Sequence, residues 1–147
     1  MSGKIGIASD HAGFQLKARL IEEMKALSLE VVDLGPTGEE RVDYPDFGFK
    51  LAEAITKGEV ERGIAICGSG IGISIALNRY KKIRAALCHD ETSARLARTH
   101  NDANVLVLGS RLIGMEVALS CLHTFLVASF EGGRHAGRVE KLSACGV

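Results

Sequence analysis

Five short apolar runs alternate along this chain with longer segments of helical period, and this alternation limits the fold more than any other feature. The apolar runs cover residues 4–9, 30–34, 62–67, 84–88 and 104–109. Segments whose apolar residues recur at helical spacing cover 14–27, 47–57, 71–79, 92–99 and 114–129, and a last short helix covers about 138–143. Alternating strands and helices, with strands that are apolar almost throughout, are typical of a parallel sheet covered on both faces.

We therefore predict a three-layer α/β/α fold of the Rossmann-like type, whose five-stranded parallel sheet has the flavodoxin-like strand order 2-1-3-4-5. The chain has 147 residues, close to the size of one domain, and contains no linker, repeat or low-complexity tract. We accordingly predict a single domain over residues 1–147 that ends in a short helical tail.

The charge balance and the hydropathy pattern exclude several classes of partner. The 18 Lys and Arg residues equal the 18 Asp and Glu residues in number, so no net positive charge favours binding to a nucleic acid or to an anionic membrane. No apolar run approaches the length of a membrane span, and no signal peptide is visible at the N-terminus. We expect a cytoplasmic protein with neither nucleic-acid nor membrane partners.

In open parallel sheets, ligands bind at the carboxyl ends of the strands, so the residues that follow each strand are the candidates for chemistry. Asp10 and His11 follow the first predicted strand, and a glycine-rich loop follows the third at Cys67. Ser110 and Arg111 follow the fifth. Because the first and third strands are neighbours in the predicted order, we expect the loops that follow them to face each other.

The loop from Gly68 to Gly72 (Gly-Ser-Gly-Ile-Gly) leads directly into a predicted helix. Its glycines permit a close backbone approach to a ligand, and the free N–H groups at a helix start favour an anion. The loop is not a dinucleotide-binding fingerprint, because Ile73 replaces the required glycine, and no Gly-Lys-Ser/Thr makes it a phosphate-binding loop of the Walker type. A tight turn without function is the alternative, but three alternating glycines favour a ligand-binding loop.

The four cysteines include no Cys-x-x-Cys pair, so we expect free thiols. A buried cysteine usually serves as a small apolar residue, and we expect this of Cys121 and Cys145 and favour it for Cys88. Cys67 differs because it ends the third strand beside the glycine loop. A helix N-terminus next to a thiol favours its thiolate form, which can act as a base or a nucleophile.

Histidines at the ends of elements are candidates for general acid–base chemistry. His11 and His100 both lie beside polar neighbours at such ends, whereas His123 falls within an apolar helical segment and is expected to be structural. His89 follows the fourth strand, where a functional and a structural role are equally open. The cysteines and histidines are scattered and lack the regular spacing of zinc ligands, so we expect no metal site.

Three arginines are suited to binding a phosphate. Arg134 and Arg138 are four residues apart among glycines, so they share one face if the segment is helical. Arg111 follows the fifth strand, and the planar guanidinium group matches phosphate geometry. A solvated basic tail is the alternative for Arg134 and Arg138.

Five motifs in collinear order carry a resemblance to a known family. They are Ser-Asp-His-Ala-Gly at 9–13, Asp-Tyr-Pro-Asp at 43–46, Ile-Cys-Gly-Ser-Gly-Ile-Gly at 66–72, Ile-Arg-Ala-Ala-Leu-Cys-His-Asp at 83–90 and His-Asn-Asp-Ala-Asn-Val-Leu at 100–106. Together they resemble the type B ribose-5-phosphate isomerases, whose wider family includes the subunits of galactose-6-phosphate isomerase. The resemblance covers essentially the whole chain.

The resemblance implies an aldose–ketose isomerase of the pentose phosphate pathway, which interconverts D-ribose 5-phosphate and D-ribulose 5-phosphate through a cis-enediolate without a metal or organic cofactor. It implies a homodimer or homotetramer with each site built from two subunits. In such an enzyme Cys67 moves the proton between C1 and C2, and His100 opens the sugar ring. The implied sugar contacts are Asp10, His11, Tyr44, Gly68, Ser69, Gly70, Ile71, Gly72 and Asn101, and the implied phosphate ligands are Arg111, Arg134 and Arg138.

One branch of the family replaces the cysteine by serine and carries a glutamate after the glycine loop. Cys67 and Ile73 make this chain similar to the cysteine branch. Two alternatives remain, namely an isomerase of allose 6-phosphate or galactose 6-phosphate, and a catalytically silent phosphosugar-binding module. Cys67 and His100 argue against the silent module, because binding alone requires neither. The glycine spacing disfavours a nucleotide-dependent oxidoreductase.

Overall fold

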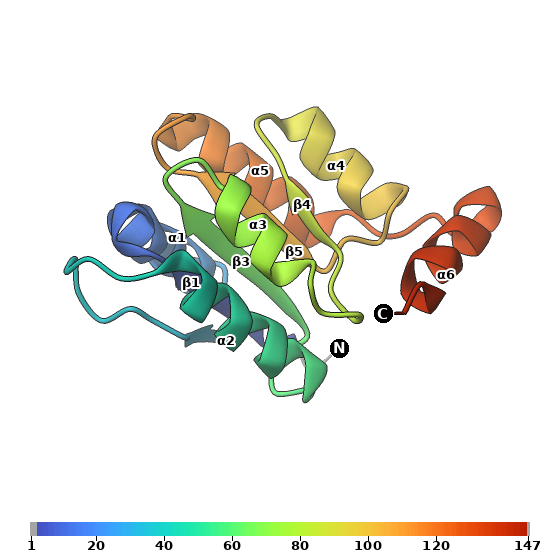
Figure 1. Cartoon of the computed structure of the whole chain (residues 1–147). Helices are drawn as coiled ribbons and strands as arrows, with labels where there is room; N and C mark the ends of the chain where they lie inside the picture. Colours follow the sequence, from blue (N-terminus) through green and yellow to red (C-terminus); the bar gives the residue numbers. More distant parts are fainter. Residues whose placement is uncertain (1–2, 147) are drawn as a thin grey trace.

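The parallel sheet lies at the centre of the molecule, with helices on both of its faces (Figure 1). A computed structural model describes residues 3–146. The strands are β1 (Ile5–Ser9), β2 (Val31–Asp33), β3 (Arg62–Cys67), β4 (Ala85–Leu87) and β5 (Val105–Gly109). The helices are α1 (Phe14–Ala26), α2 (Tyr44–Thr56), α3 (Ile71–Leu77), α4 (Glu91–Thr99), α5 (Met115–Val127) and α6 (Ala136–Ala144), with 3-10 turns η1 (His11–Gly13) and η2 (Gly133–His135). The predicted α/β class and five-stranded parallel sheet are confirmed.

The strand order is β2-β1-β3-β5-β4, so the predicted order 2-1-3-4-5 is wrong for the last two strands. All five residues of β5 are buried, whereas β4 has three half-buried residues. A strand that is apolar on both faces is stabilised most at an inner position, and a short strand serves as the edge. As a result β5 pairs with β3, with Cys67 opposite Gly109, and the loops after β1, β3 and β5 lie side by side.

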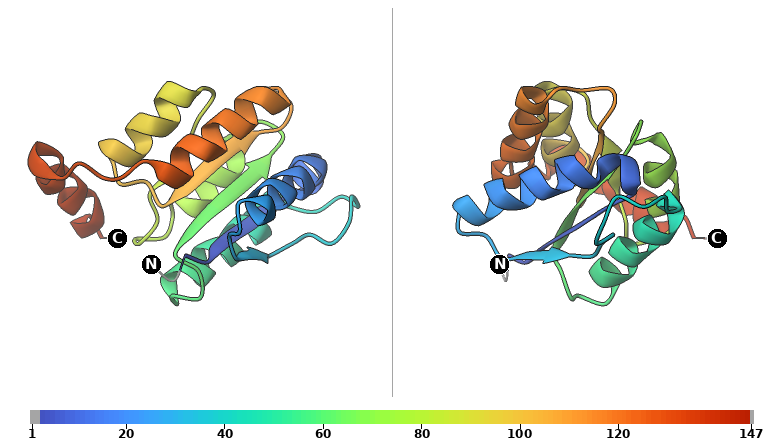
Figure 2. Two further views of the ribbon diagram at one scale, coloured as in Figure 1. Left: turned by 180° about the vertical axis from the view of Figure 1, so that it is seen from behind. Right: turned by 90° about the vertical axis from the view of Figure 1, so that its left-hand side faces the viewer.

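Two hydrophobic cores fill the space between the sheet and its helices. One core packs α1, α4 and α5 against Ile64 and Ile66 of β3, and the helices of this face are seen in Figure 2, left. The other core packs α2 and α3 against Ala65 and Cys67. Because side chains alternate along a strand, this alternation points the Cys67 thiol toward α2 and α3.

Helix α2 begins at Tyr44, three residues before the predicted start at position 47. Pro45 lies in its first turn. Proline is favoured there because an N–H group at this position would have no acceptor within the helix. The connection leading to this helix is tethered by Lys17, which is 2% exposed. Its Nζ atom donates to Asp33 Oδ1 at 2.7 Å and to the Pro36 carbonyl at 3.0 Å. This contact holds the segment between β2 and α2 against α1.

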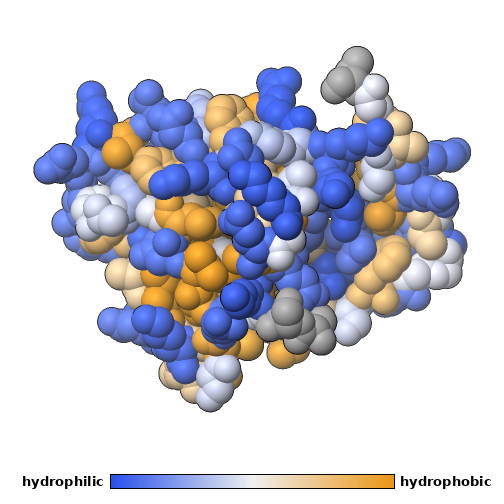
Figure 3. Space-filling view, turned by 90° about the horizontal axis from the view of Figure 1, so that it is seen from below, coloured by the Kyte–Doolittle hydropathy of each residue, from blue (hydrophilic) through white to orange (hydrophobic). Residues whose placement is uncertain are grey.

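Helix α6 stands out from the body of the molecule at the right of Figure 1. Its one buried residue is Val139, while Leu142 is exposed. Figure 3 shows the molecule from below, with apolar side chains among charged ones over the body and over α6 at the right. Among residues 3–146, none of the helices combines the length and the apolar character that crossing a membrane requires.

Candidate active site

The glycine loop after β3 needs its glycines for steric reasons. Gly70 has a φ of +77°, in the left-handed region that glycine tolerates, and it directly precedes α3. A Cβ atom at this position would lie 2.5 Å from Leu87 Cδ1 and 3.1 Å from the Leu108 backbone. A Cβ atom at Gly72 would lie 2.5 Å from the ring of Tyr44. The loop therefore fits closely between the sheet and the Tyr44 ring.

Cys67 lies at the inner end of a pocket of about 590 Å³ at the carboxyl edge of the sheet. Its side chain is 4% exposed, and the glycine loop forms one wall. The residues of the predicted site that line this pocket are Asp10, Tyr44, Cys67, Gly68, Ser69, Ile71, Gly72 and Arg111. Ile75 and Leu112 also line it and were not predicted. Sequence reasoning missed these two because exposed apolar residues carry no motif.

Hydrogen bonds hold the loop after β3 against the loop after β5. The N–H of Ser110 donates to the Cys67 carbonyl at 2.9 Å, and the N–H of Arg111 donates to the Gly68 carbonyl at 2.9 Å. A Cβ atom at Gly68 would lie 3.2 Å from Nη1 of Arg111, so the guanidinium lies over the loop. The Arg111 cation thus lies against the glycine loop, in the same pocket as the Cys67 thiol.

Asp10 and His11 occupy the loop after β1, which faces the loop after β3 as predicted. The N–H of Asp10 donates to the Ile66 carbonyl at 3.1 Å, and its Oδ1 accepts from the Gly13 N–H at 3.1 Å. His11 Nδ1 accepts from the Val42 N–H at 3.2 Å. This bond anchors the segment before α2, and His11 is not among the residues that line the Cys67 pocket.

A second group of predicted residues lies at the other end of the sheet. His100 ends α4, which runs back from the carboxyl edge to the amino edge, and Asn101 lines a separate pocket of about 480 Å³ with Arg84 and Leu142. Arg134 and Arg138 are exposed on η2 and α6. A single chain therefore does not bring these four residues to Cys67.

His135 is a neighbour of the predicted site residue His100 that sequence reasoning missed. Its ring stacks on that of His100, with centroids 4.2 Å apart and planes inclined by 16°. Burial, together with the nearby charges of Arg134, His100 and Arg138, lowers the pKa of His135 below its usual value. The only signal in the sequence is its position between Arg134 and Arg138. Its burial depends on the placement of α6, which local patterns do not give.

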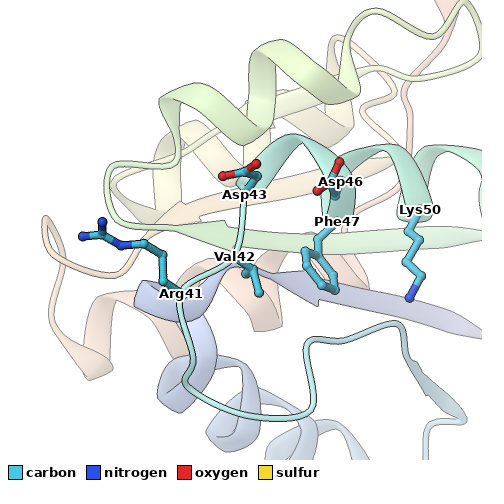
Figure 4. A pocket seen from close by; sticks show the side chains of 6 residues that line it. All are labelled: Arg41, Val42, Asp43, Asp46, Phe47 and Lys50. Carbon is cyan, nitrogen blue, oxygen red and sulfur yellow. The ribbon is translucent and has the colours of Figure 1, made fainter.

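A further pocket of about 520 Å³ lies at the start of α2 and is shown in Figure 4. The side chains of Arg41 and Lys50 point in different directions, and Asp43 and Asp46 lie on the helix start. These charged groups do not converge on one point, and none of the predicted site residues lines the pocket. We assign it no chemistry.

The remaining cysteines differ in their surroundings. Cys88 and Cys121 are buried, as expected, and burial raises the pKa of Cys121 to about 11 and also raises that of Cys88. The expectation that Cys145 is a buried apolar residue is wrong, because it lies exposed directly after α6, a helix in which Val139 is the buried residue. Cys67 is the cysteine that faces a pocket with polar groups around it.

Comparison with known proteins places this architecture in one family. Residues 5–142 match the family model described as Ribose/Galactose Isomerase. Ribose-5-phosphate isomerase B of Escherichia coli K12 is 46% identical over 141 residues, which cover 96% of this chain and 95% of that protein. A structure of the Clostridium thermocellum enzyme is 54% identical, with a TM-score of 0.94 and 95% of each chain covered.

A structural relative also carries a ligand. Ribose-5-phosphate isomerase B of Mycoplasma genitalium, solved with bound ribulose-5-phosphate, is 44% identical. Its TM-score is 0.93, and the match covers 97% of this chain and 95% of that one. Given this coverage and the family match over 5–142, the chain belongs to the ribose/galactose isomerase family.

Proposed function

We propose that this chain interconverts D-ribose 5-phosphate and D-ribulose 5-phosphate. The observation that carries the proposal is the Cys67 thiol in one pocket with the glycine loop and Arg111. The family supports the proposal, since the relative from Mycoplasma genitalium, which is 44% identical to this chain, was solved with bound ribulose-5-phosphate. The free thiols fit a reducing compartment, so we place the enzyme in the cytoplasm.

The chemistry requires a base and a stabilised oxyanion. In the open-chain aldose, the Cys67 thiolate takes the proton from C2, and the electron pair moves through C2–C1 onto the C1 oxygen to give the enediolate. Transfer of a proton between the two oxygens and return of the Cys67 proton to C1 give the ketose, with no net change in oxidation state. One well-placed donor to the oxyanion is typically worth about 3–4 kcal/mol. The backbone of the 68–72 loop offers such donors beside Cys67.

We further propose that a second copy of the chain completes each site, in a homodimer or a homotetramer. Ile71, Ile75 and Leu112 rim the Cys67 pocket and are 52%, 51% and 56% exposed, an apolar edge that fits a covering subunit. The partner subunit then brings to this pocket the predicted residues that lie far from Cys67 within a single chain. That group comprises His100 for ring opening, Asn101 for the sugar, and Arg134 and Arg138 for the phosphate.

The test is isomerisation of ribose 5-phosphate by purified, metal-free protein, with allose 6-phosphate and galactose 6-phosphate assayed in parallel. The proposal predicts turnover of the pentose phosphate with the highest kcat/KM of the three. Preferred turnover of a hexose phosphate would move the chain to another activity of the same family. Binding of all three without turnover would establish a silent phosphosugar-binding module.

A further inference from the structure

Three side chains that are distant in sequence form a cluster at the amino edge of the sheet. They are His100 at the end of α4, Glu131 in the segment after α5, and His135 in η2. One ring nitrogen of each histidine and one carboxylate oxygen of Glu131 lie within 4.8 Å of one another. The backbone holds the cluster together, because the N–H of Glu131 donates to the Thr99 carbonyl at 3.0 Å.

A buried nitrogen without a partner points into this cluster. His135 is 6% exposed, and among residues 3–146 its Nε2 has no hydrogen-bond partner. The nearest carboxylate oxygen, Glu131 Oε1, is 3.8 Å away, which is beyond hydrogen-bond distance. A buried polar atom left unpaired destabilises the folded protein, so a ligand that engages Nε2 recovers the lost interaction.

The set of donors is that of a zinc-type site. Two imidazoles and one carboxylate form a common three-ligand set for Zn²⁺ and leave a fourth position open. We propose that His100, Glu131 and His135 bind a divalent transition-metal ion such as Zn²⁺, and that this ion inhibits the enzyme.

Binding requires only the less buried members of the cluster to move. Bond lengths of about 2.0–2.1 Å bring tetrahedral ligand atoms to roughly 3.3 Å from each other, closer than the 3.8 Å between His135 Nε2 and Glu131 Oε1. His135 is fixed by burial, whereas His100 is half-buried and Glu131 is 56% exposed. One His100 nitrogen already lies within 4.8 Å of the other two ligand atoms, so shifts of the His100 and Glu131 side chains close the remaining gap. Arg134 and Arg138 oppose a cation, but both are exposed and water screens their charge.

The inhibitory effect rests on the proposed function, because it follows from the ring-opening role of His100. A metal-bound His100 nitrogen can neither accept nor donate the proton that moves when the furanose opens. Occupancy therefore blocks conversion of the cyclic sugar phosphate. Cys67 lies at the other edge of the same chain and does not contribute a ligand to this cluster.

The direct test is a Zn²⁺ titration of metal-free protein in competition with a chromophoric chelator, in phosphate-free buffer. Glu131→Gln is expected to weaken binding at least tenfold and to leave isomerase activity without metal unchanged. The matched control Glu140→Gln changes an exposed glutamate on α6, outside the cluster, and is expected to keep wild-type affinity. Cys67→Ala is also expected to keep wild-type affinity for Zn²⁺. This variant is needed because zinc also binds thiols, and it distinguishes binding at the cluster from binding at Cys67.

Equal affinity of wild type and Glu131→Gln would overturn the proposal, and so would loss of binding in Cys67→Ala. Inhibition is measured on ribose 5-phosphate with wild type and Glu131→Gln, and the variant is expected to need at least tenfold more Zn²⁺. Zinc binding without inhibition would overturn the inhibitory role. The protein could bind Zn²⁺ as expected and yet show no isomerase activity in the absence of metal. That result would refute the proposed function and leave the metal site standing.

Discussion

The carbonyl oxygen of Cys67 accepts a hydrogen bond from the backbone N–H of Ser110 at 2.9 Å, and the Ser110 hydroxyl lies 3.3 Å from the same oxygen. The hydroxyl also donates to the Ala12 carbonyl at 2.8 Å. One residue after β5 thus links the end of β3 at Cys67 with the turn after β1. The link exists because β5, not β4, is the neighbour of β3.

Ser110→Ala removes the hydroxyl and keeps the backbone bond. We expect a loss of about 1 kcal/mol in the free energy of unfolding, typical of one hydrogen bond. We also expect kcat to fall several-fold, because the Cys67 loop is held less firmly. Denaturant titration and steady-state kinetics measure the two effects. Thr92→Ala, at an exposed position of α4, is the control, and identical kinetics in both variants would contradict the role of Ser110.

Gly109→Ala places a methyl group against the glycine loop. The added Cβ would lie 2.5 Å from the Ser69 carbonyl oxygen and 2.7 Å from its carbonyl carbon, so backbone must move. Overpacking of this kind typically costs about 1–3 kcal/mol, and the displaced loop should lose most of its activity. Gly38→Ala has no atom within 4 Å of the new Cβ and serves as the control. Wild-type stability and activity of Gly109→Ala would contradict the packing described.

The buried thiol of Cys121 makes stability depend on pH in the alkaline range. Burial raises its pKa from 9.0 to about 11, so the unfolded chain loses this proton at lower pH than the folded chain. The contribution to stability is complete below pH 9 and is lost as pH rises through 11. Cys121→Ala should therefore flatten the fall in unfolding free energy over this range. The difference in unfolding free energy between wild type and Cys121→Ala at pH 7 gives the loss of packing alone. If the unfolding free energy of both proteins falls equally steeply between pH 9 and 11, the prediction is contradicted.

Mixing two variants that are each expected to be inactive tests whether each site uses two chains. In a heterodimer of Cys67→Ala and His100→Asn, one site carries both substitutions and the other carries neither. Equal mixing makes half of the dimers hybrid, so activity should return to roughly a quarter of the wild-type value. Co-expression followed by an isomerase assay measures it. Absence of any recovery, with hybrid dimers demonstrated, would show that each site is built from a single chain.

The parts of the fold that were predictable depend on local patterns. The apolar strand at 62–67 is found as predicted, and the glycine loop after it leads into α3. The predicted start of α2 at position 47 is three residues late, because Pro45 fits the first turn of the helix. The predicted order of β4 and β5 was wrong, because local sequence patterns do not show which of the two strands lies at the edge of the sheet.

The candidate site was predictable only in part. Residues that follow β1, β3 and β5 could be identified, since the carboxyl ends of parallel strands share one edge. His100 follows a helix instead, and motifs do not show that it lies at the opposite edge. The burial of His135 depends on α6 and on a contact with His100 that no periodicity encodes.

The most direct test of the account is the turnover of ribose 5-phosphate by Cys67→Ala, with substrate binding measured separately. A general base typically contributes about 10²–10⁴-fold to the rate. We predict that kcat falls by at least about 10³-fold. The dissociation constant for ribose 5-phosphate should stay within a few-fold of the wild-type value, because the loop backbone and the arginines remain. A variant with near wild-type kcat would contradict the assignment of Cys67 as the group that moves the proton.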